Sequence, residues 1–170
     1  MLLPHASAVA RPVTLPVPAA AVTAGLEPGT RVQTDQGALP VEHLYPGDRV
    51  ALPGGGFATL RRVERVRVLG LAMTVLESGA LPGQTGALAL PSGHPVLTRD
   101  WRTQLLHSTE SVLVPAGKLD EGALVRRETR AVQTLLRLVF DRPVVLRAEG
   151  AWLSCATPRP IEAARPARLH

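Results

Sequence analysis

With 170 residues, 45% of them apolar, and a formal net charge of +5, the chain is long enough to bury a core and has an ordinary globular composition. Its single cysteine, Cys155, excludes an internal disulfide framework. No apolar run is long enough to cross a bilayer and no stretch reads as a convincing signal peptide. We therefore expect no membrane partner and, by default, a cytoplasmic location, with secretion that needs no N-terminal signal left open.

Residues 1–24 are predicted to be a flexible leader. They are rich in Ala, Pro and Val, and they follow neither a helical nor an alternating period. Their prolines would interrupt any helix, because proline lacks the backbone N–H that a helix interior needs. The folded domain is expected to begin after this segment.

Two Pro-Gly turns organise the next part of the chain. Pro28-Gly29 and Pro46-Gly47 combine the fixed φ of proline with the positive φ that glycine tolerates. Each turn precedes an alternating run with β-branched residues, 30–34 and 48–52, which is typical of a half-buried strand. Residues 35–37 end the first run like the turn of a hairpin.

This order of residues resembles the opening of a Hint domain, the fold shared by hedgehog autoprocessing domains and inteins, and is most similar to the bacterial stand-alone type. A histidine segment at 93–97 and a closing strand at 144–150 are similar as well, so the resemblance covers roughly 25–155. It implies a single all-β domain, a horseshoe of many short, twisted antiparallel strands, with 156–170 as a basic flexible tail. The positions in register are Gly29, Thr30, Thr34, Gly37, Pro40, Val41, Glu42, Leu44, Pro46, Gly47, Asp48 and Val50.

Further elements follow from the same patterns of apolar runs and turn residues. We expect two extended stretches separated by Gly70, a strand pair, a short strand, a brief helical turn and a closing hairpin. Their ranges are 57–69, 71–77, 87–98, 112–114, 115–119, and 132–140 with 144–148.

The resemblance implies an autocatalytic acyl shift and shows where its groups would lie. A Cys or Ser at the first position of the domain attacks the preceding carbonyl, and a histidine protonates the leaving nitrogen. In this chain the nucleophile position is Gly25, which has no side chain. His94 matches the histidine, whereas the threonine expected three residues earlier is Pro91, with the hydroxyl of Ser92 displaced. Thr30 is a further candidate site residue.

Other positions depart from the same pattern. Splicing inteins end on an asparagine that cyclises, and this sequence contains no asparagine. Bacterial relatives tend to carry a tyrosine, a histidine and a second histidine where this chain has Leu135, Arg137 and Pro143. Cys155 could act as a downstream nucleophile, but nothing in the sequence activates it, and a structural thiol is the plainer interpretation.

Each remaining polar candidate has a structural alternative. His94 is interpreted either as a vestigial general acid or as a turn histidine bonded to backbone. Glu42 and Asp48 look like a carboxylate pair but fit better as turn residues that accept backbone N–H groups. The histidines and Cys155 lack metal-ligand spacing, so we expect no metal and no cofactor.

The sequence leaves three hypotheses for function. The first is a degenerate Hint domain that acts as a binding or structural module, a monomer with an unidentified protein partner. The second is a residual autoprotease that cuts near Ala24-Gly25 with His94 as the acid. The third is an arginine-rich module that binds an acidic partner through the arginines of 61–67. A nucleic-acid partner is disfavoured, because aromatic side chains to stack bases are too few.

Overall fold

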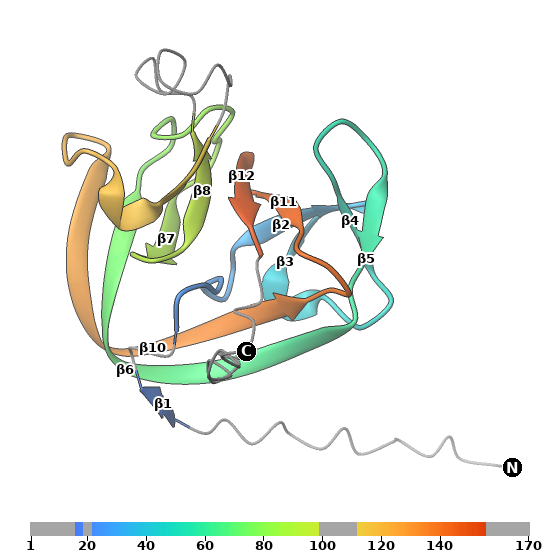
Figure 1. Cartoon of the computed structure of the whole chain (residues 1–170), viewed down its shortest axis with the longest axis horizontal. Coiled ribbons are helices and arrows are strands. Elements are labelled where there is room, and N and C mark those ends of the chain that lie inside the picture. Colours follow the sequence, from blue (N-terminus) through green and yellow to red (C-terminus); the bar gives the residue numbers. More distant parts are fainter. Residues whose placement is uncertain (1–15, 19–21, 99–111, 156–170) are drawn as a thin grey trace, which may run out of the picture.

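A computed structural model describes residues 16–18, 22–98 and 112–155 of the chain (Figure 1). The elements in these ranges are strands and two single turns of 3₁₀ helix, so the predicted all-β fold class is confirmed. In chain order they are β1 (Pro16–Pro18), β2 (Arg31–Thr34), β3 (Gly37–Pro40), η2 (Val41–His43), β4 (Arg49–Ala51), β5 (Phe57–Thr59), β6 (Arg62–Leu76), β7 (Leu88–Pro91), β8 (Pro95–Thr98), β9 (Val112–Pro115), η3 (Ala116–Lys118), β10 (Val125–Val139), β11 (Val145–Ala148) and β12 (Ala151–Ser154).

Strands β6 and β10, each of 15 residues, form one long antiparallel ribbon. The ribbon curves beneath the shorter strands, which gives the molecule its curled shape (Figure 1). β7 pairs with one end of β6, and β1 pairs with β6 in parallel. The shorter strands make a second sheet in the order β5-β4-β2-β11-β12-β8-β9, with β3 paired to β2.

The two Pro-Gly turns form as expected. Gly29 and Gly47 have φ of 91° and 98°, the left-handed region that favours glycine. Glu42 from η2 accepts the N–H of Gly29 at 2.7 Å, and that hydrogen bond is the largest cause of the lowered pKa of its carboxyl group. Asp48 accepts the N–H of Tyr45 at 2.8 Å. Both carboxylates therefore lie in the turns, as their structural interpretation predicts.

Two expectations about strands are wrong. Gly70 does not separate two stretches, because β6 runs through it with a φ of 63°. β10 and β11 do not form a hairpin, since β10 pairs with β6 and β11 pairs with β12 and β2. Pairing is decided by the non-local partner, which apolar patterning in one segment does not reveal.

Apolar side chains pack in two clusters. The larger one fills the space between the sheets and contains Leu26, Leu136 and Cys155 among others. The smaller cluster packs on the β6 and β10 ribbon, and its members are Val22, Val66, Val68, Leu71, Met73, Val75, Ala89 and Leu135.

The domain boundaries at 24 and 155 remain predictions. Residues 1–15, 19–21 and 156–170 lie outside the described part of the chain. Within the leader, Pro16–Pro18 pairs with β6, and Val22 is buried in the smaller cluster. No helix among the described residues is long and apolar enough to span a membrane.

Candidate functional site

The segment around Gly25 is held against β10 on its C-terminal side. Leu26 forms an isolated antiparallel bridge with Leu136, in which each backbone N–H donates to the other residue's carbonyl, at 2.9 Å and 2.8 Å. The Leu26 side chain is 1% exposed, so apolar burial adds to this attachment. The bridge sets the position of the preceding Ala24–Gly25 peptide.

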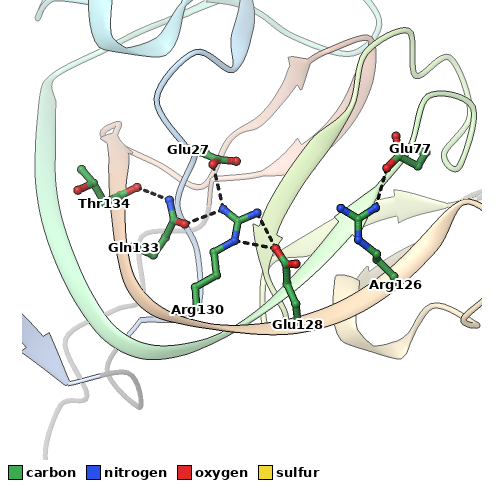
Figure 2. Close-up of polar contacts among 7 residues, drawn as sticks. All are labelled: Glu27, Glu77, Arg126, Glu128, Arg130, Gln133 and Thr134. Atoms are coloured by element: carbon green, nitrogen blue, oxygen red, sulfur yellow. Dashed lines mark hydrogen bonds and ion pairs between the residues drawn. The ribbon is translucent and has the colours of Figure 1, made fainter.

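An arginine network attaches the next residue, Glu27, to the same strand (Figure 2). The Arg130 guanidinium donates to the Glu27 carboxylate at 2.9 Å and to Gln133 at 2.7 Å. It also pairs with Glu128 at 2.7 Å. Gln133 in turn donates to the Thr134 carbonyl at 2.8 Å. Two attachments to β10 thus follow directly after Gly25. The first is the hydrogen-bonded and buried bridge of Leu26, and the second is the ionic network of Glu27.

His94 contacts the backbone of Gly25 from the turn between β7 and β8. The Gly25 N–H donates to His94 Nδ1 at 3.1 Å across 69 residues of sequence. The turn is closed by the His94 N–H, which donates to the Pro91 carbonyl at 2.8 Å. The two residues that the resemblance assigned to one reaction centre are therefore in direct contact.

The imidazole of His94 is buried and neutral. It is 1% exposed, and burial lowers the pKa of His94 to about 4, against a smaller opposite effect of the Gly25 and Ser154 backbones. Because Nδ1 accepts a hydrogen bond, the neutral ring carries its proton on Nε2. Nε2 itself has no partner with hydrogen-bond geometry among the described residues.

A leucine occupies the space beside residue 25. A Cβ atom added to Gly25 would lie 3.0 Å from Leu135 Cβ and 3.2 Å from its Cδ1, closer than most real contacts. Leu135 is fully buried in the smaller apolar cluster, which leaves it little freedom to move. The site therefore has neither a nucleophilic side chain nor ready room for one.

A small cavity of about 20 Å³ lies next to the junction and is lined by Gly25, His94, Arg137 and Cys155 among others. This volume is enough for about one water molecule. Arg137 donates to Glu64 of β6 at 2.7 Å, while its Nε is buried without a described partner. Burial raises the pKa of the Cys155 thiol to about 12, so the sulfur stays protonated at neutral pH.

Two further hydroxyl candidates have their described contacts elsewhere than at Gly25. Ser92, the displaced hydroxyl, lies 3.0 Å from the hydroxyl of Thr74 on β6. Thr30 is buried in the turn after Gly29, and its backbone bonds Glu27 and Val41. None of the contacts described for Thr30 involves Gly25 or His94, so its role remains a prediction.

Three features of the site escape sequence reasoning. Leu135 fills the nucleophile's space, Arg137 pairs with Glu64, and Arg130 holds Glu27. The first two had a partial signal, because the resemblance leads one to expect a tyrosine at Leu135 and a histidine at Arg137, but neither contact could be inferred from it. Within ranges 16–18, 22–98 and 112–155, no three His, Cys, Asp or Glu side chains are placed to hold a metal ion.

The arginines of 61–67 are partly neutralised. Arg61 pairs with Asp141 at 2.7 Å, and Arg62 pairs with Glu64 at 2.8 Å. These pairs are solvent-exposed, so they add little stability, but they reduce the charge available to a partner.

Comparison with known proteins shows which family and fold this chain resembles. A family model described as "Hint domain" matches residues 24–159. The solution structure of a bacterial intein-like domain from Clostridium thermocellum is 15% identical, with a TM-score of 0.52 and coverage of 78% of this chain and 97% of that one. The crystal structure of the TvoVMA intein is 10% identical, with a TM-score of 0.56 and coverage of 79% and 98%. At such identities the likeness concerns the fold. The chain matches none of the curated proteins.

Proposed function

Because this chain belongs to the Hint domain family, we propose that it is a degenerate member. It has lost the nucleophile that starts splicing, and it serves as a binding or structural module. Its Ala24–Gly25 peptide stays intact.

One observation carries the proposal, namely the packing at residue 25. The acyl shift needs a hydroxyl or thiol on the residue that follows the scissile bond. Gly25 supplies neither, and Leu135 Cβ stands 3.0 Å from the point where a side chain would begin. The buried aliphatic side chain in this space contributes to packing and offers no reactive group.

The remaining reactive groups support the same conclusion. With the pKa of His94 near 4, about one imidazole in a thousand carries the acidic proton at pH 7. Nδ1 also faces the Gly25 N–H as an acceptor, which is the wrong protonation state for an acid. Cys155, with a pKa near 12, offers almost no thiolate.

The intact mass of the full chain under denaturing conditions tests this proposal. The protein is followed for a day at pH 7, with and without hydroxylamine, which cleaves both thioesters and esters, or a thiol, which cleaves thioesters. We expect one unchanged mass in every sample. A loss that matches residues 1–24, accelerated by hydroxylamine, would contradict the proposal.

A second function, residual self-cleavage by water, is favoured by the 3.1 Å contact between His94 Nδ1 and the Gly25 nitrogen. Water would add to the Ala24 carbonyl carbon and lose one proton to solvent, a protonated His94 would give its proton to the departing Gly25 nitrogen, and the C–N bond would break to leave an Ala24 carboxyl group and a Gly25 amine. His94 would then regain a proton from solvent. Cleavage by this route must accelerate as the pH falls toward 4 and must vanish in His94→Ala. Cleavage that persists in that variant would refute the mechanism.

A further inference from the structure

The outer face of the second sheet carries one continuous row of side chains. Strand register defines the row: Ala148 lies opposite Val32, which places Arg147 beside Gln33 on the other face. Arg147 on β11 lies directly opposite Trp152 on β12. The inward neighbours of these residues are fully buried, so the row points to solvent.

The row continues onto apolar side chains. Leu153 lies opposite Val96, so Trp152 is next to Leu97 of β8, and Leu97 pairs with Leu113 of β9. Leu113 is 42% exposed, and both Trp152 and Leu97 are half-buried. The face is therefore polar and basic on β2 and β11 and apolar on β12, β8 and β9, strands that neighbour one another in the sheet (Figure 1).

Two hollows flank Arg147. One of about 450 Å³ is lined by Arg31, Gln33 and Arg147 together with Glu149, and one of about 370 Å³ is lined by Arg147, Trp152 and Leu97 among others. Both volumes fall in the range of about 300–1,000 Å³ that is common for ligand pockets.

No carboxylate among the described residues neutralises the arginines on this face. Neither Arg31 nor Arg147 forms a salt bridge with a carboxylate of the described residues. Glu149, the acidic residue in the first hollow, accepts the backbone N–H of Arg31 at 2.7 Å. Arg147 Nε donates to the Gly150 carbonyl at 3.2 Å, and the guanidinium lies 5.8 Å from the Trp152 ring centroid. Its position is thereby fixed while its two terminal nitrogens remain without a described partner.

We propose that this row, Arg31, Gln33, Arg147, Trp152, Leu97 and Leu113, is a docking surface for an extended acidic peptide segment of a partner protein. Carboxylates of the peptide bind Arg31 and Arg147, and an adjacent aliphatic side chain enters the hollow beside Trp152 and Leu97. The proposal rests on the binding function proposed above and names its surface and the chemistry of its partner.

The chemistry of the row favours a peptide over a nucleic acid. Planar guanidinium groups bind carboxylates through two parallel N–H donors, and arginine with tryptophan is the combination enriched at the energetic centres of protein interfaces. A single aromatic ring on this row offers little base stacking, which disfavours a nucleic acid.

The test measures fluorescence anisotropy of a labelled peptide with the full chain. The probe is Leu-Ser-Leu-Ser-Glu-Ser-Glu-Ser-Leu-Ser-Leu, which reads the same in both directions and puts Glu and Leu on one face when extended. We expect saturable binding that weakens several-fold between 50 and 500 mM salt. Arg147→Gln and Trp152→Ala should each weaken it about tenfold, because each removes a central contact.

Arg65→Gln is the matched control, because it removes the same charge from β6 and should leave the affinity within about twofold. Arg147→Lys keeps the charge but removes the two parallel N–H donors of the guanidinium. Its loss of affinity should lie between those of Arg65→Gln and Arg147→Gln. Circular dichroism verifies the fold of each variant, and Trp152→Leu replaces Trp152→Ala if the latter unfolds.

Three results would overturn the surface: no saturable binding by the wild type, an equal loss in Arg65→Gln, or tighter Arg147-dependent binding of an oligothymidylate than of the peptide. Denaturing mass of the same samples separates this proposal from the preceding one. If the peptide binds and the chain also cleaves itself, the proposed loss of chemistry is refuted and the docking surface stands. If the peptide does not bind and the chain stays intact, the docking surface is refuted and the proposed loss of chemistry stands.

Discussion

The junction at Gly25 and the outer row around Arg147 use similar groups in opposite ways. At the junction, a buried histidine, a paired arginine and a buried thiol surround a cavity of about 20 Å³. On the outer row, Arg147, which pairs with no carboxylate in the described part of the chain, lies between hollows of about 450 and 370 Å³. In the function proposed above, burial and pairing make the first region inert, while the second retains both charge and room for a ligand.

If the proposed docking surface is correct, the comparison teaches that the position of a family's reaction centre need not be the position of a member's function. Groups that would react are held in unreactive protonation states by desolvation at the junction. Groups that would bind are displayed where a rigid sheet orients them.

The largest expected effect is at the packing of the junction. Leu135→Ala should lower the free energy of unfolding by about 2–5 kcal/mol, because it removes a fully buried side chain. Val132→Ala, on the same strand and 47% exposed, should cost less than about 0.5 kcal/mol. Urea denaturation measures both.

The contact with Gly25 is tested in the same series. Gly25→Ala should destabilise the wild type, since its Cβ would lie 3.0 Å from Leu135 Cβ and 3.2 Å from Leu135 Cδ1. Leu135→Ala removes Cδ1 but keeps Cβ, so only part of this cost should be relieved in that background. No destabilisation by Gly25→Ala in the wild type would mean that the junction is not tightly packed, and the contrast with the outer row would lose its basis.

The second effect is a dependence of stability on pH through His94. Its pKa is about 4 in the folded state and 6.5 in the unfolded state, so the unfolded chain binds more protons between these values. Stability from this residue is complete above pH 6.5 and is lost as the pH falls toward 4, by roughly 3 kcal/mol at about 1.4 kcal/mol per pKa unit.

His94→Gln keeps an acceptor for the Gly25 N–H but does not titrate. Urea midpoints of the wild type and the variant, measured from pH 4 to pH 8, should therefore diverge in slope only below about pH 6.5. Parallel curves across the whole range would show that His94 is solvated. The junction would then be open to solvent, as the outer row is.

The smallest effect concerns the ionic attachment of Glu27. Arg130→Met should cost about 1 kcal/mol, since its side chain is 26% exposed and pairs with both Glu27 and Glu128. Arg126→Met breaks a single pair with Glu77, shown beside the network in Figure 2, in which the arginine is 60% exposed, and should have almost no effect. Thermal unfolding at low and high salt measures both variants, and a loss that salt does not reduce would argue against an ionic role.

The turns and the first hairpin of the fold were predictable because their sequence signals are local. The turns at Gly29 and Gly47 and the β2–β3 hairpin follow from residue types within a few positions of one another. The first half of β10 was missed, because the charged run 126–130 reads as a loop until β6 supplies its pairing partner.

The site was predictable only in part, for the same reason. Gly25 and His94 came from motif spacing, and the structure brings them into contact. The pairing of Arg137 with Glu64 joins residues 73 positions apart, and the close approach of Leu135 to Gly25 depends on backbone placement at the level of a few tenths of an ångström. Composition and periodicity carry no information of that kind.

The parallel pairing of β1 with β6 has a consequence for any assay of the Ala24–Gly25 peptide bond. Pro16–Pro18 lies against residues 67–69 of β6, and Val22 is buried in the smaller apolar cluster. A chain cut after Ala24 would therefore keep its N-terminal piece as a bound subunit, held by hydrogen bonds and apolar contact. Gel filtration would then report one particle of unchanged size, and only a method that unfolds the protein would count two polypeptides.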